Sequence, residues 1–121
     1  MEIEIGDYVR TNSGLIFKVN EITYDEEYKD YLYKESFLLV DWKENIVKHS
    51  KQLIDLVEVG DYVNGHLVVE ISKNAYNQKI VITEVDGKDG AIRHHYLERS
   101  IKNVVTHEQF ESIEYKVEED K

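Results

Sequence analysis

The residues of this chain that could bind a metal ion or carry a reaction are mainly histidines and carboxylates, because its 121 residues include no cysteine. His94 and His95 are the most ligand-like pair, but neighbours on a β-strand point to opposite faces and do not readily share one ion. His107 and Glu111 lie four residues apart on a predicted helix, with no third ligand near them in the sequence. The sequence therefore predicts no metal site and no cofactor.

The sequence also lacks the local patterns of common enzymes. It contains no Gly-x-Gly-x-x-Gly, no Walker lysine loop and no Gly-x-Ser-x-Gly. Paired carboxylates occur at Glu26-Glu27 and Glu118-Glu119, in polar segments where nothing would separate their pKa values as acid–base catalysis requires. We therefore predict no catalytic residue and a non-enzymatic protein.

The distribution of tyrosine points to binding instead. Four of the nine tyrosines crowd around a run of carboxylates, and the single tryptophan follows shortly after. Tyrosine and tryptophan dominate binding hot spots because they bring a large rigid area and a polar group. We predict that an acidic tyrosine-rich segment contacts a partner through Tyr24, Asp25, Glu26, Glu27, Tyr28, Asp30, Tyr31, Tyr33 and Trp42. The alternative is that Tyr33 and Trp42 complete a core while Tyr28 and Tyr31 pack the loop onto it.

The charge of the chain restricts its partners. Fifteen basic against 25 acidic residues give a net charge of −10, which repels nucleic-acid phosphates and anionic lipids. Duplex DNA and membranes are therefore not expected as partners, whereas a basic surface on a partner protein would suit this charge.

Two alternative kinds of ligand stay open. A nucleotide or other small signal would use Arg10, Arg93, His94, His95 and Arg99, and a nucleic-acid-binding module would use Lys73, Lys79, Arg93 and Arg99.

An internal repeat organises the chain. Residues 3–9 recur as residues 57–63, with five identical positions and two exchanges between isoleucine and valine. Each copy contains Gly-Asp-Tyr-Val and is followed by a turn signal and a β-branched run. We interpret Asp7 and Asp61 as structural acceptors of backbone N–H groups in this turn. The first copy carries six extra residues, which we place within residues 24–32.

The apolar patterns between these landmarks predict short strands at residues 15–22, 36–42, 46–49, 67–71, 79–85 and 91–96. Short strands with hairpin turns and one helical turn before the last strand resemble an SH3-like barrel. We predict a mainly β fold of two tandem SH3-like small β-barrels in a rigid pair, at residues 1–57 and 58–105. Residues 106–121 form an appendage, in which a capping box at Thr106 and Gln109 starts a helix to about Ser112, and residues 113–117 add an edge strand for a homodimer.

The whole chain, particularly residues 5–11, 49–65 and 101–112, resembles a group of small uncharacterised proteins encoded by phages and prophages of Firmicutes, clostridia especially. The resemblance implies a viral accessory protein in the host bacterial cytoplasm, a location that the missing cysteines and the polar N-terminus also favour. It implies no catalytic residue. We expect an anti-defence inhibitor, in the manner of an anti-CRISPR protein, that mimics nucleic acid on a host nuclease or other effector. A sponge for a small signal is the alternative.

Overall fold

The N-terminal half of the protein consists of two small antiparallel sheets. The computed structural model describes residues 2–113 and is mainly β, with a short C-terminal helix. The strand orders in this half are β2-β1-β6 and β3-β4-β5. The strands are β1 (Tyr8–Thr11), β2 (Ile16–Lys18), β3 (Glu21–Asp25), β4 (Asp30–Lys34), β5 (Val40–Trp42) and β6 (Ile46–Ser50), and the 3-10 turn η1 (Lys43–Asn45) precedes β6.

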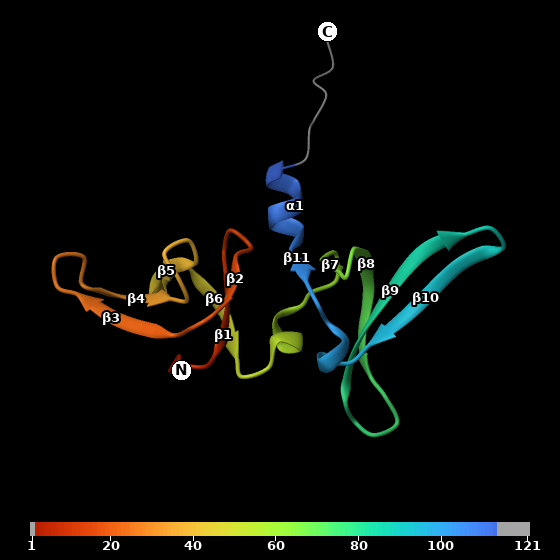
Figure 1. The fold of residues 1–121 in the computed structure, drawn as a ribbon, viewed down its shortest axis with the longest axis horizontal. Helices are drawn as coiled ribbons and strands as arrows, with labels where there is room; N and C mark the ends of the chain where they lie inside the picture. The colour runs from red at the N-terminus through yellow and green to blue at the C-terminus, as the bar shows by residue number, and fades with distance from the viewer. Residues whose placement is uncertain (1, 114–121) are drawn as a thin grey trace, which may run out of the picture.

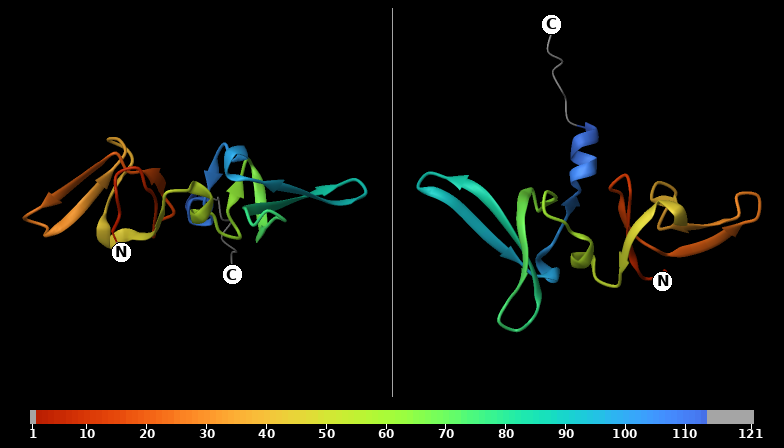
Figure 2. Two further views of the ribbon diagram at one scale, coloured as in Figure 1. Left: turned by 90° about the horizontal axis from the view of Figure 1, so that it is seen from below. Right: turned by 180° about the vertical axis from the view of Figure 1, so that it is seen from behind.

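The C-terminal half contains one five-stranded antiparallel sheet in the order β10-β9-β8-β7-β11, followed by helix α1 (Figure 1). Its elements are the 3-10 turn η2 (Leu53–Leu56), β7 (Tyr62–Val63), β8 (His66–Lys73), β9 (Lys79–Gly87), β10 (Gly90–Tyr96), the 3-10 turn η3 (Glu98–Ser100), β11 (Val104–Val105) and α1 (His107–Ile113). The β3–β4 and β9–β10 hairpins project at opposite ends of the molecule (Figures 1 and 2).

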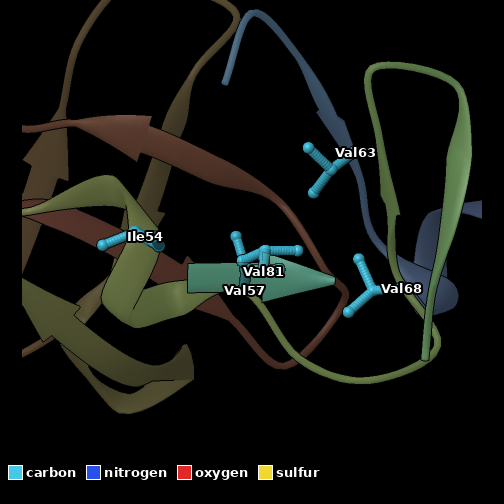
Figure 3. Packing of buried hydrophobic residues seen from close by; sticks show 5 residues of the cluster. All are labelled: Ile54, Val57, Val63, Val68 and Val81. Carbon is cyan, nitrogen blue, oxygen red and sulfur yellow. The ribbon is translucent and has the colours of Figure 1, made fainter. Parts of the chain in front are cut away.

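Each half has its own hydrophobic core. The core of the first half is built from Val9, Phe17, Val19 and Tyr33. The core of the second half is the cluster of Ile54, Val57, Val63, Val68 and Val81 (Figure 3). Because Ile54 comes from η2, the segment that joins the halves packs into the second core.

The repeated motif adopts the same local structure in both halves, as the duplication predicts. Gly6 and Gly60 have φ of +96° and +101°, a conformation that strains residues with a Cβ atom. Asp7 and Asp61 are both buried, and each accepts the backbone N–H of the residue three positions before it, at 3.0 and 2.8 Å. These contacts confirm that both aspartates have a structural role.

The C-terminal helix begins with the predicted capping box. The Thr106 N–H donates to Gln109 Oε1 at 3.3 Å, and the Gln109 N–H donates to Thr106 Oγ1 at 3.2 Å. The buried Thr106 hydroxyl also donates to the Gly14 carbonyl at 2.7 Å, which connects the start of α1 to the N-terminal half.

Helix α1 ends at Ile113. The predicted edge strand at residues 113–117 therefore lies, apart from Ile113, outside the described part of the chain. Within that part, no helix is long and apolar enough to cross a membrane.

The described strands form three open sheets that do not close into barrels, so the two SH3-like barrels expected from the sequence are not confirmed (Figure 1). Two predicted strands need correction. The strand predicted at residues 15–22 is divided into two strands, β2 and β3. The strand predicted at residues 36–42 begins only at Val40. Residues 36–39 form a turn in which Phe37 and Leu38 are 91% and 82% exposed, since the chain reverses direction there between β4 and β5.

Candidate functional site

The acidic tyrosine-rich segment forms the β3–β4 hairpin and its loop. Asp25 and Asp30 face each other at the last register position, which leaves a four-residue loop. The Asp25 side chain accepts the Tyr28 N–H at 2.8 Å, and its carbonyl accepts the Lys29 N–H at 2.7 Å. Lys29 closes the loop in the left-handed conformation, with φ of +56°. Asp25 therefore shapes the loop, while the neighbouring Glu26 is exposed to solvent.

Four aromatic rings in and beside this hairpin form two pairs. The Tyr28 and Trp42 ring centroids lie 4.3 Å apart, and those of Tyr24 and Tyr31 lie 5.0 Å apart with the rings edge to face. Tyr24, Tyr28 and Tyr31 are 52%, 59% and 42% exposed. Because each ring is supported by another, these large side chains are positioned before any partner arrives.

The register of the strands places the two pairs on opposite faces of the hairpin. Tyr24 lies directly opposite Tyr31, so both side chains lie on one face. Trp42 lies opposite Leu32, the neighbour of Tyr31, and side chains alternate along a strand. Tyr28 therefore contacts an aromatic ring on the other face. The sequence predicts a single binding face, whereas the structure shows a projecting hairpin with aromatic residues on both sides and carboxylates at its tip.

Tyr33 is not available to a partner. It is 4% exposed and packs with Val9, Phe17 and Val19 in the first core. Burial, with a smaller contribution from the charge of Asp30, raises the pKa of its hydroxyl above the ordinary value of 10. For this residue the alternative interpretation, that it completes the core, is the correct one.

The residues predicted for a small-signal site do not converge. Arg10 is completely buried, and Arg93 forms an ion pair with Glu84 at 3.0 Å. His94 and His95 are consecutive on β10, and the His94 ring stacks on His66 at 5.3 Å. Arg99 lies separately, in η3. The structure therefore shows no single ligand site made from these five residues.

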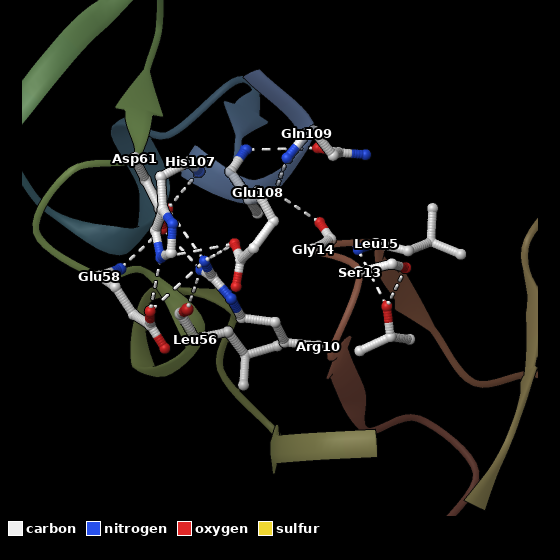
Figure 4. A network of polar contacts seen from close by, with 12 residues as sticks. Arg10, Ser13, Gly14, Leu15, Leu56, Glu58, Asp61, His107, Glu108 and Gln109 are labelled. Atoms are coloured by element: carbon white, nitrogen blue, oxygen red, sulfur yellow. Dashed lines mark hydrogen bonds and ion pairs between the residues drawn. The ribbon is translucent and has the colours of Figure 1, made fainter. Parts of the chain in front are cut away.

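Arg10 instead joins the two halves of the protein (Figure 4). Its guanidinium donates to both Asp61 oxygens, at 2.6 and 3.0 Å, and to the Leu56 carbonyl at 2.9 Å. It also donates to Glu108 in α1 at 2.6 Å. This role was not predicted from the sequence. The signal that could have indicated it is a difference between the two copies of the repeat, since Arg10 in the first copy is replaced by Asn64 in the second.

Three residues next to Arg10 are close enough to consider as metal ligands. One ligand atom each from Glu58, His107 and Glu108 lies within 4.8 Å of the others. These atoms already have partners, since His107 Nε2 lies 3.1 Å from Glu58 Oε1 and Lys48 Nζ lies 2.8 Å from Glu58 Oε2. Burial raises the pKa of Glu58, but the hydrogen bonds from Lys48 and His107 outweigh it and hold this pKa below its ordinary value. The cluster is accordingly an ion-pair network.

No family model matches this chain, and no match was found among curated proteins or solved structures. The resemblance to phage-encoded proteins therefore stays a prediction.

Proposed function

We propose that this chain is a non-enzymatic binding protein whose β3–β4 hairpin inserts into a basic cleft of a host bacterial protein. The cleft would be one that otherwise holds nucleic acid, so that the chain acts as an inhibitor of a host defence or nucleic-acid-handling protein. The observation that carries this proposal is the projecting hairpin, which combines an acidic tip with aromatic pairs on both faces. A cleft, unlike a flat surface, contacts both faces of an inserted hairpin.

The charges of the hairpin suit a cleft lined by arginine and lysine. Within residues 25–30 four carboxylates accompany one lysine, Lys29, on a chain of net charge −10. Such a charge distribution accelerates association with a basic surface and disfavours acidic competitors. A negative hairpin would thereby occupy the space of a phosphate backbone.

The tyrosines add a short-range attraction to the same partner. Lys43 Nζ already lies 5.6 Å from the Tyr31 ring centroid, in the arrangement of a cation–π contact. Such contacts contribute about 0.5–2 kcal/mol each, and arginine forms them more often than lysine. Arginines in the cleft would therefore stack on the exposed tyrosines while they pair with the carboxylates.

We also propose that residues 1–57 and 58–105 are two SH3-like units and that residues 106–121 are an appendage. The shared turns at Gly6 and Gly60 support two repeated units. In this arrangement the binding hairpin is a loop added to a small structural unit, a common location for function.

Capture from a lysate tests the proposal. The immobilised protein is incubated with a lysate of a Firmicutes bacterium, and bound proteins are identified by mass spectrometry. We expect capture of a nucleic-acid-binding protein that an excess of DNA oligonucleotide releases. The Tyr28→Ala/Tyr31→Ala variant should lose this protein with a change in melting temperature of only a few degrees, because both rings are at the surface and belong to neither core.

Tyr76→Ala is the matched control, because Tyr76 is exposed but lies in the loop between β8 and β9. This control should retain the captured protein. The proposal is wrong if the double variant captures the same proteins as the original chain, or if DNA fails to compete.

A further inference from the structure

A hollow of about 690 Å³ lies in the C-terminal half, between η2, the β8–β9 hairpin and η3. This volume is within the range of roughly 300–1,000 Å³ that small-molecule sites have. Three cationic side chains line it, together with amides from the turn between β8 and β9, and these residues are Lys73, Lys79, Arg99, Asn77 and Gln78. Three of the four residues suggested by the sequence for nucleic-acid binding thus meet at one place, while Arg93 is paired elsewhere.

The two carboxylates that line the hollow are occupied by the protein itself. The Glu98 oxygens accept the Leu53 and Ile54 N–H groups at 2.9 and 2.7 Å, which caps the start of η2. Asp55 accepts the Ser50 hydroxyl at 2.6 Å and pairs with Lys79 at 3.3 Å. Neither carboxylate forms an ion pair with Lys73 or Arg99.

Lys73 and Arg99 have no ion-pair partner among residues 2–113. Both side chains are exposed and line the hollow, so their charges are available to an anionic ligand. More remote carboxylates oppose anion binding weakly, since salt at about 0.1 M screens charges beyond roughly 10 Å. The local charges therefore determine what the hollow attracts.

We propose that this hollow binds a ligand that carries a phosphate group. Lys73 and Arg99 would hold the phosphate oxygens, since guanidinium and ammonium groups form the strongest hydrogen bonds to such anions. The amides of Asn77 and Gln78 would bind a polar group attached to the phosphate, and the side chains of Ile54 and Leu97 offer apolar contact. A nucleotide and the backbone of single-stranded nucleic acid share this chemistry.

Isothermal titration at about 0.1 M salt tests the site with three probes: pyrophosphate, a nucleoside diphosphate and a short oligothymidylate. We expect saturable binding of at least one probe. Lys73→Gln/Arg99→Gln should weaken that binding about tenfold or more, because two charged contacts are removed. Tighter binding of the diphosphate identifies a free nucleotide as the ligand, and tighter binding of the oligothymidylate identifies a nucleic-acid backbone.

Lys88→Gln/Lys102→Gln is the matched control, because it changes the net charge equally at two exposed lysines outside the hollow. Its affinity should stay within about twofold of the original. The inference is overturned if none of the probes binds, or if the two double variants lose affinity equally. Tyr28→Ala/Tyr31→Ala should leave this binding unchanged, which separates the test from that of the proposed function.

Discussion

Replacing Arg10 by methionine tests whether the polar network at the junction stabilises the whole protein. The substitution keeps a long side chain but leaves the Asp61 carboxylate, which has no exposed surface, without its cation. Removing one partner of a buried ion pair lowers stability by about 3–5 kcal/mol. Glu58 and Glu108 are partly exposed, so the loss of their contacts adds less than about 1 kcal/mol each.

Urea denaturation at neutral pH measures this effect, because urea, unlike guanidinium, does not screen charges. We expect one transition for the original protein, since the network joins the two halves. Arg10→Met should lower the free energy of unfolding by about 3–5 kcal/mol and the melting temperature by roughly 10–20 °C. Arg93→Met is the matched control, because the half-exposed Arg93 pairs with Glu84 and Glu70 at the surface and should contribute less than about 1 kcal/mol.

A second substitution checks the physical cause. If the loss comes from the unpaired Asp61 charge, Asp61→Asn added to Arg10→Met should recover part of the stability, because a neutral amide is less unfavourable when buried. A loss of stability in Arg10→Met no larger than that in Arg93→Met would show that the network does not stabilise the protein. An Arg10→Met/Asp61→Asn variant that is less stable than Arg10→Met, by as much as Asp61→Asn alone destabilises the original protein, would show that the unpaired Asp61 charge is not the cause.

Two further predictions concern stability. Lys29→Gly should raise the free energy of unfolding by about 0.5–1 kcal/mol, because Lys29 has φ of +56°, and an unchanged or lower urea midpoint would contradict this. The second prediction concerns pH. Burial raises the pKa of Asp7, but hydrogen bonds from the Glu4 N–H, Lys51 and His49 lower it below its ordinary value of 3.8. Burial also raises the pKa of Glu58, but hydrogen bonds from Lys48 and His107 lower it below its ordinary value of 4.5. The stability that these two carboxylates contribute is therefore present above their ordinary pKa values and is lost as the pH falls through their folded-state pKa values. Urea midpoints should decline below about pH 4.5, and they should decline less steeply in Asp7→Asn/Glu58→Gln.

The features predicted well from the sequence are local in the chain. The capping box of Thr106 and Gln109 spans three residues, and the turn at Gly6-Asp7 is determined by the same few residues in both copies of the repeat. Glycine at a positive φ and a side chain that caps a nearby N–H need no distant partner. The composition of the hairpin loop likewise showed where carboxylates and tyrosines gather.

Local sequence patterns were sufficient to predict the mainly β character, the repeated turn, the start of α1 and the acidic tyrosine-rich segment. The packing of distant segments, in contrast, buries Arg10 against Asp61, 51 residues away, and Glu108, 98 residues away. The same packing places Tyr33 in the core, the two aromatic pairs on opposite faces, and Lys73 and Arg99 around one hollow. Local patterns follow from backbone conformation within a few residues, whereas burial and partner choice depend on which distant segments pack together.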